Sequence, residues 1–165
     1  MTLVERWNYH NELGIQFPIP LLRVVYAKAG TLAAACLLRD QQAVIDHKLY
    51  WSKPTSEHEG RYLIALFNSE ITRKRIENHQ SRGQWGARDF DKVMFTLPIP
   101  LFDSKRSLHT DLAAAAREAE TLAAQVEFPD GVKFQRARKF IRDALAEAGI
   151  AQRIDTLVAR LLDGM

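Results

Sequence analysis

A helix start signal flanked by strand-like sequence limits what this chain can fold into. Ser56 and Glu59 form the pattern Ser-x-x-Glu, a capping box that satisfies backbone donors at the start of a helix. Directly after it, "GRYLIALFNS" at 60–69 places apolar residues at helical spacing. The sequence before it, from 21 to 51, has the character of strands. The chain therefore predicts an α+β domain.

Four apolar segments predict a small mixed or antiparallel sheet. Three of them, 21–30, 31–40 and 43–51, precede the capping box and are separated by a glycine and by a short polar stretch. The fourth, 92–97 ("KVMFTL"), is followed by Pro98, which cannot donate a hydrogen bond to a strand ladder. We expect this fourth strand to belong to the sheet as well.

The remaining segments predict helices. Residues 69–80 ("SEITRKRIENHQ") would pair with 60–69 as a helical hairpin inserted into the sheet region. Strong helix formers fill 108–126. Two further helical segments close at Gly149 and Gly164, since glycine is favoured just after a helix end. The last third should form a C-terminal helical bundle.

These elements divide the chain into three parts. Residues 1–20 form a linker or edge segment, because the prolines of "FPIP" exclude helix there. Residues 21–106 form the α+β domain, and residues 107–165 form a helical region packed on it. A chain of 165 residues is long enough to bury a core without disulfides or metals.

Positive charge is concentrated in two segments, although the formal net charge is only +3. Residues 73–92 hold six lysines and arginines against three acidic residues, and residues 133–142 hold five against none. Such clusters favour binding of a polyanion, although a solvated helix face gives the same pattern. In the second segment, helical spacing would bury Phe134 and Ile141 and leave the cations outside.

The sequence has no features of a secreted or membrane protein. No apolar run approaches the roughly 20 residues of a membrane span, and the N-terminus lacks the apolar core of a signal peptide. The single cysteine, Cys36, can form no internal disulfide, and its apolar neighbours predict a buried thiol. We expect a cytoplasmic protein that does not contact the membrane.

Motifs for catalysis and cofactor binding are missing. The eight glycines form no G-x-G pair, the six prolines are never adjacent, and no zinc-ligand spacing occurs. The Asn-Pro-Pro-aromatic tetrad of amino-methyltransferases is therefore excluded. We expect this chain to be non-catalytic by itself, with no cofactor and no metal. One alternative is a small metal-dependent nuclease, because Asp91, Asp103 and Lys105 loosely match a two-carboxylate metal site with a lysine.

Three motifs occur here in the order found in a known family. They are "YLIALFNS" at 62–69, "GQWGARDFDK" at 83–92 and "LPIPLFD" at 97–103. Together they resemble the target recognition domain of adenine-N6 DNA methyltransferases of restriction-modification systems, and more distantly the recognition domains of type I specificity subunits. The resemblance implies binding of double-stranded DNA. It also implies a methyltransferase catalytic domain, in the same or another chain, as partner.

The resemblance gives the segment 81–92 a role as a glycine-hinged loop that reads DNA. Arg82, Gln84 and Arg88 suit hydrogen bonds to base edges, and Lys92 suits a phosphate. Trp85 could stack or wedge beside a flipped base, since an adenine methylase must extrude its target. Packing of Trp85 on the core is the alternative. The strand predicted after the loop would anchor it.

Two further groups complete the predicted DNA-binding residues. Lys48, Tyr50 and Lys53 come from a predicted strand and its exit, where alternation places Tyr50 and Trp51 on opposite faces. Arg73 and Lys74 come from the first basic segment. We therefore expect a sequence-specific DNA-recognition domain. Besides the nuclease, a protein-interaction domain that docks a partner subunit remains an alternative.

Overall fold

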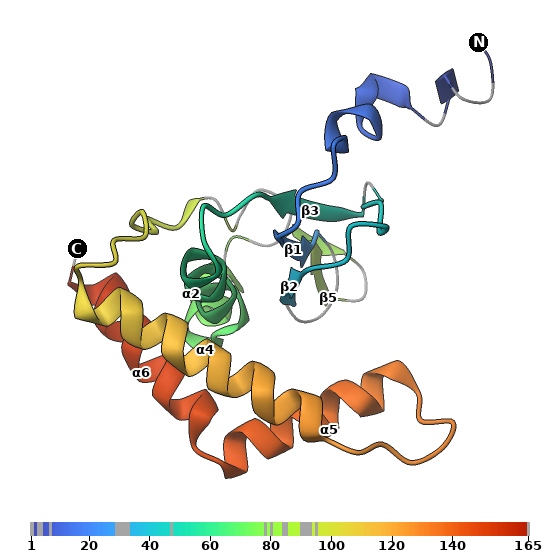
Figure 1. The fold of residues 1–165 in the computed structure, drawn as a ribbon. Helices are drawn as coiled ribbons and strands as arrows, with labels where there is room; N and C mark the ends of the chain where they lie inside the picture. The colour runs from blue at the N-terminus through green and yellow to red at the C-terminus, as the bar shows by residue number, and fades with distance from the viewer. Residues whose placement is uncertain are drawn as a thin grey trace.

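The computed structural model has the expected α+β architecture, with a small sheet followed by a helical region (Figure 1). The structure describes residues 2, 5–6, 8–28, 34–46, 48–77, 79, 81–83, 86–89, 94 and 96–164, with the backbone alone for 9, 81–83 and 86–89. No helix among these residues combines the length and the apolar character that a membrane crossing requires.

A three-stranded antiparallel sheet forms the N-terminal half. Its strands are β1 (Arg23–Ala27), β2 (Ala35–Leu38) and β3 (Leu49–Ser52), with β1 in the centre. Val24 and Tyr26 share one face of β1 and are almost fully buried in the main core. These β-branched and aromatic side chains fit a pleated surface that is covered by a helix.

Helix α2 (Glu57–Asn68) begins where the capping box predicts. The Ser56 hydroxyl accepts a hydrogen bond from the Glu59 N–H at 3.1 Å. In a full capping box, the Glu59 carboxylate would accept a hydrogen bond from the N–H of Ser56. Here it reaches one residue further and accepts hydrogen bonds from the N–H and the hydroxyl of Thr55. The helix is thus fixed at its start, and its buried face packs against β1 and β2.

Three helices follow in the last third: α4 (Ser107–Gln125), α5 (Phe134–Glu147) and α6 (Ile150–Asp163). Helix α4 packs against both α2 and α6, and α5 lies beside the C-terminal end of α4 (Figure 1). The core therefore runs from the sheet through α2 and α4 to α6. Its largest fully buried apolar side chains are Tyr62, Leu66, Ile76, Met94, Leu112 and Val158.

The connection between α2 and α4 contains a short helix and a hairpin. Helix α3 (Glu70–Glu77) follows α2 after Ser69, whose hydroxyl hydrogen-bonds the Asp155 carboxylate of α6 at 2.6 Å. Strands β4 (Ser81–Gly83) and β5 (Gly86–Asp89) then form a separate two-stranded antiparallel sheet.

Three local predictions are wrong. In the segment 92–97, the described residues Met94 and Thr96 lie outside any strand, although Met94 is fully buried. The apolar character of the segment predicted the burial of Met94, but not its backbone conformation. Cys36 is exposed, because alternation along β2 turns its neighbour Leu37 inward instead. Phe134 is 74% exposed, since it begins α5 at the edge of the helical region.

Arg23 is fully buried, and its side chain supports the segment 39–46 beside the sheet. The Nη2 of Arg23 donates to the carbonyls of Asp40 and Ala43 at 2.7 and 2.8 Å. Gln16 makes two more hydrogen bonds to the backbone of Ile45. Side chains thus satisfy backbone groups in the segment 39–46, and the strand predicted over 43–51 is shortened to β3.

Candidate nucleic-acid interface

The segment predicted as a loop, 81–92, contains the two-stranded ribbon β4–β5. Gly83 pairs with Gly86, so a two-residue connection joins the strands. Ser81 pairs with Asp89 and Arg82 with Ala87, which leaves Arg88 between two pairs as the extra residue of a bulge. A bulge bends and twists its strand, so it alters the direction of the side chains around it. Gly83 and Gly86, which flank a two-residue connection, indicate a hairpin, and the prediction of a loop overlooked this signal.

The predicted base-reading residues all belong to this ribbon or its immediate flanks. Arg82 lies on β4 and Arg88 on β5, where the structure describes the backbone. Gln84 and Trp85 form the connection in the sequence, and Lys92 follows β5. These three residues lie outside the described part of the chain. The ribbon backbone therefore brings Arg82 and Arg88 to neighbouring strands a few residues from the connection.

The β3 candidates divide into two exposed lysines and a packed aromatic. Tyr50 is half-buried, and its ring centroid lies 5.2 Å from that of Tyr26. The Lys28 ammonium lies 4.2 Å above the Tyr50 ring, a cation–π distance. Tyr50 is thus the aromatic on the core side, as alternation along β3 requires. Lys48 and Lys53 are exposed at the two ends of the strand.

The two α3 candidates differ in their electrostatic surroundings. Arg73 donates to Glu70 at 2.7 Å and also pairs with Glu77 at 3.4 Å. The bond to Glu70 raises the pKa of Arg73. Lys74 is exposed and forms no ion pair with a described carboxylate. Lys74 is therefore better placed than Arg73 to meet a phosphate, because Arg73 would first have to leave two carboxylates.

Glu70 is influenced by cations from both basic segments. Its pKa is lowered first by the hydrogen bond from Arg73, and also by the charges of Lys74 and Arg142. Arg142 lies on α5, so residues about 70 positions apart in the sequence act on one carboxylate. Charge composition predicted two basic segments, but it could not predict that α3 and α5 both pack against α6.

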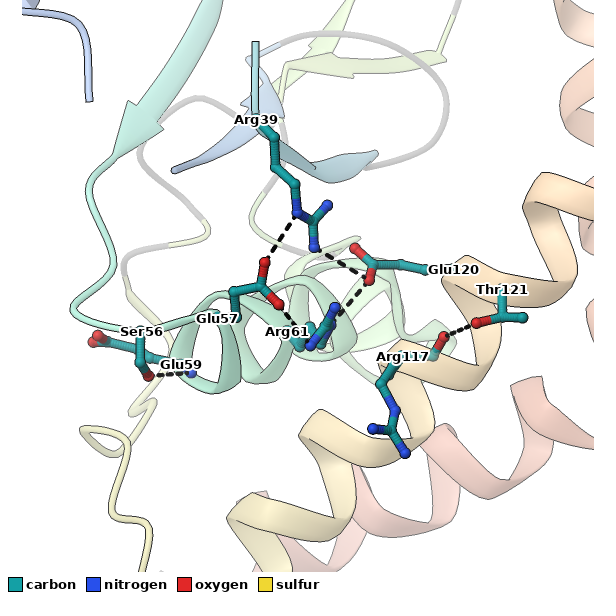
Figure 2. A network of polar contacts seen from close by, with 8 residues as sticks. All are labelled: Arg39, Ser56, Glu57, Glu59, Arg61, Arg117, Glu120 and Thr121. Atoms are coloured by element: carbon teal, nitrogen blue, oxygen red, sulfur yellow. Dashed lines mark hydrogen bonds and ion pairs between the residues drawn. The ribbon is translucent and has the colours of Figure 1, made fainter. Parts of the chain in front are cut away.

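Many other cations of the chain are paired with carboxylates. Figure 2 shows a network in which Arg39 and Arg61 both bind Glu57 and Glu120. The network ties the segment after β2 to α2 and α4, and hydrogen bonding from Arg39 lowers the pKa of Glu57. Arg117 points away from this network (Figure 2). The paired cations serve the packing of elements, and they are less available to a polyanion.

Asp103 and Lys105, the described members of the nuclease alternative, lie in a turn before α4. The Asp103 carboxylate accepts a hydrogen bond from the Lys105 N–H at 2.9 Å, as an Asx turn does. Asp91 lies outside the described residues. Within the part of the chain that the structure describes, no group of three or more His, Cys, Asp or Glu side chains could hold a metal. The turn accounts for Asp103 and Lys105 without a metal.

His109 lies on α4 and connects this turn to the helix. Its Nδ1 accepts a hydrogen bond from the Asp103 N–H at 3.0 Å, and its ring lies 4.8 Å from that of Tyr62. Burial and the nearby Arg106 lower the pKa of His109, while Asp103 opposes them. Burial also raises the pKa of Tyr62 to about 12, and its hydroxyl donates to the Pro100 carbonyl. The neutral imidazole is therefore part of the fold.

Acidification should weaken the fold through His109. The unfolded chain takes up a proton near pH 6.5, whereas the folded state resists it. This contribution to stability is complete above that pH and decreases as the pH falls below it. Urea unfolding at pH 8 and pH 5 measures the loss. In His109→Asn, which keeps an acceptor but does not titrate, the loss should be smaller; an equal loss would exclude His109 as its source.

Comparison with protein-family models, with curated proteins and with solved structures gives no match for this chain.

Proposed function

We propose that this chain is the sequence-specific DNA-recognition domain of a restriction-modification DNA methyltransferase and is non-catalytic by itself. The observation that carries the proposal is the β4–β5 ribbon with Arg82 and Arg88 on its strands and Gln84 in its connection. The major groove of DNA admits a two-stranded ribbon. Arginine and glutamine are residues that form paired hydrogen bonds with guanine and adenine there.

Phosphate contacts would set the position of the ribbon on the duplex. The exposed Lys48, Lys53 and Lys74 are suitable groups, because an ammonium on a flexible stem can follow the backbone. Such contacts orient the protein but carry no sequence information. Recognition and positioning would thus be divided between the ribbon and these surface lysines.

The expected partner is an adenine-specific methyltransferase catalytic domain, in the same or another chain. The resemblance supports this partner, because the three ordered motifs belong to the recognition part of such enzymes. The catalytic domain would supply the cofactor site, the tetrad and part of the clamp around the duplex. Recognition by this chain alone should therefore be weaker than that of the complete enzyme.

Selection from a pool of random-sequence duplexes tests the proposal. The full chain is immobilised at low salt, and bound duplexes are amplified over successive rounds. We expect one sequence to become enriched and to bind about 10²–10³-fold more tightly than its scrambled version, near the lower end for specific DNA binders. A pool that binds but stays unchanged in sequence would contradict sequence recognition.

A further inference from the structure

The two basic segments reach α3 and α5, and both of these helices pack against α6. The pKa of Glu70 is lowered most by the hydrogen bond from Arg73, and further by the charges of Lys74 on α3 and of Arg142 on α5. Ser69, directly before α3, is also hydrogen-bonded to Asp155 of α6. The Glu70 N–H donates to the same carboxylate, so the start of α3 is held against α6.

Helix α5 presents its cations outward. None of its residues is fully buried, and Arg136, Lys139 and Arg142 are all exposed. At 100° per residue these three lie within a sector of about 120°, and the helical rise spaces them over about 9 Å. The only acidic residues of α5, Asp143 and Glu147, lie in its second half. The helix thus carries a row of positive charge.

Contacts within α5 hold two of its arginines over aromatic rings. The guanidinium of Arg136 lies 5.7 Å from the centre of the Phe140 ring, and that of Arg138 lies 5.6 Å from the centre of the Phe134 ring. Such stacking limits side-chain freedom while the charge stays at the surface. Lys139 differs, because it pairs with Asp143 at 2.6 Å.

The arrangement fits a duplex backbone better than a lipid surface. A membrane-binding basic helix needs a wide apolar face that is free to enter the lipid. On α5, the apolar residues Ala137, Ile141 and Leu145 are half-buried, and the helix contacts both α4 and α6. Duplex DNA carries about one negative charge per 1.7 Å of its axis, so a row of cations along it gains contacts without needing apolar area.

We infer that the surface formed by Lys74 of α3 and by Arg136 and Arg142 of α5 binds backbone phosphates of duplex DNA. This inference rests on the proposed function, and it adds a second contact region outside the ribbon. The surface would contribute equally to all DNA sequences, because phosphates carry no sequence information. It would hold the duplex while the ribbon reads it.

Neutralising the three cations tests the inference. In the full chain, Lys74→Gln, Arg136→Gln and Arg142→Gln are combined. The affinity for a fluorescent random-sequence duplex is then measured by anisotropy between about 50 and 200 mM salt. Each lost phosphate contact should flatten the slope of log affinity against log salt by about 0.9, so the triple variant should be shallower by about 2.7.

A matched control separates local contacts from net charge. Arg39→Gln, Arg75→Gln and Arg153→Gln remove the same charge, but these arginines pair with Glu57 and Glu120, with Asp163 and with Glu118, respectively. We expect the control to change the slope by less than one unit. Equal flattening in both variants, or no flattening in the first, would overturn the inference.

Two further results separate this inference from its rivals. The triple variant could flatten the salt slope while the wild-type chain enriches no DNA sequence. That result would support the phosphate surface and contradict the proposed function. Binding to vesicles that contain phosphatidylserine tests the alternative of a lipid surface. If the wild-type chain bound them, and if the triple variant lost that binding while its DNA affinity stayed unchanged, the surface would be a lipid surface and the inference would fail.

Discussion

Leu112→Ala is expected to lower the free energy of unfolding by about 3–5 kcal/mol. Leu112 is fully buried on α4 within the core shared with α2 and α6. The substitution removes the transfer free energy of the side chain and leaves a cavity that well-packed neighbours refill only in part. Urea unfolding monitored by circular dichroism measures the change from the midpoint and the slope.

Leu101→Ala is the matched control, because the same chemical change occurs at a side chain that is 91% exposed. Its effect should stay within about 0.5 kcal/mol. Similar effects at both positions would contradict the packing of α4 in the core. This packing matters for function, since α4 contacts α5, the helix that carries Arg136 and Arg142 of the proposed phosphate surface.

Local signals were sufficient for much of the fold. The Ser56 capping box predicted the start of α2, because a helix start depends on a few adjacent residues. Apolar patterning and local propensity predicted β1 and the C-terminal helices, because both signals depend on nearby residues. The α+β class follows from these elements alone.

The features that sequence could not predict depend on distant contacts. Arg23 is fully buried because the segment 39–46 folds over it and supplies two carbonyl acceptors. The packing of α3 and α5 against α6 likewise requires the tertiary fold. The hairpin 81–89 was missed for a different reason, since five polar or charged residues and two glycines suggest a loop when strand pairing is ignored.

Replacing Arg82, Gln84 and Arg88 together with alanine should abolish most sequence discrimination. Each bidentate contact to a base contributes about 1–3 kcal/mol, so losing two or more should weaken binding of the selected duplex at least about 30-fold. Binding of scrambled duplex should change much less, because its contacts are to phosphates. If these side chains are exposed, each substitution should change stability by no more than about 0.5 kcal/mol.

Thermal melting of the same variant distinguishes a loss of DNA contacts from a loss of folding. A large loss of melting temperature, with binding reduced only in proportion to the unfolded fraction, would show that the ribbon side chains support the fold instead. An unchanged melting temperature with lost discrimination would assign them to recognition. Arg153→Ala provides a comparison at a cation that is paired with Glu118 on the surface.

The ratio of affinities for the selected and the scrambled duplex tests the central claim most directly. It is measured by competition in one buffer, for the wild-type chain and for the variant lacking Arg82, Gln84 and Arg88. The account predicts a ratio of about 10²–10³ for the wild type and a ratio near one for the variant, with both proteins folded. A wild-type ratio near one, or an unchanged ratio in the folded variant, would contradict sequence recognition by the β4–β5 ribbon.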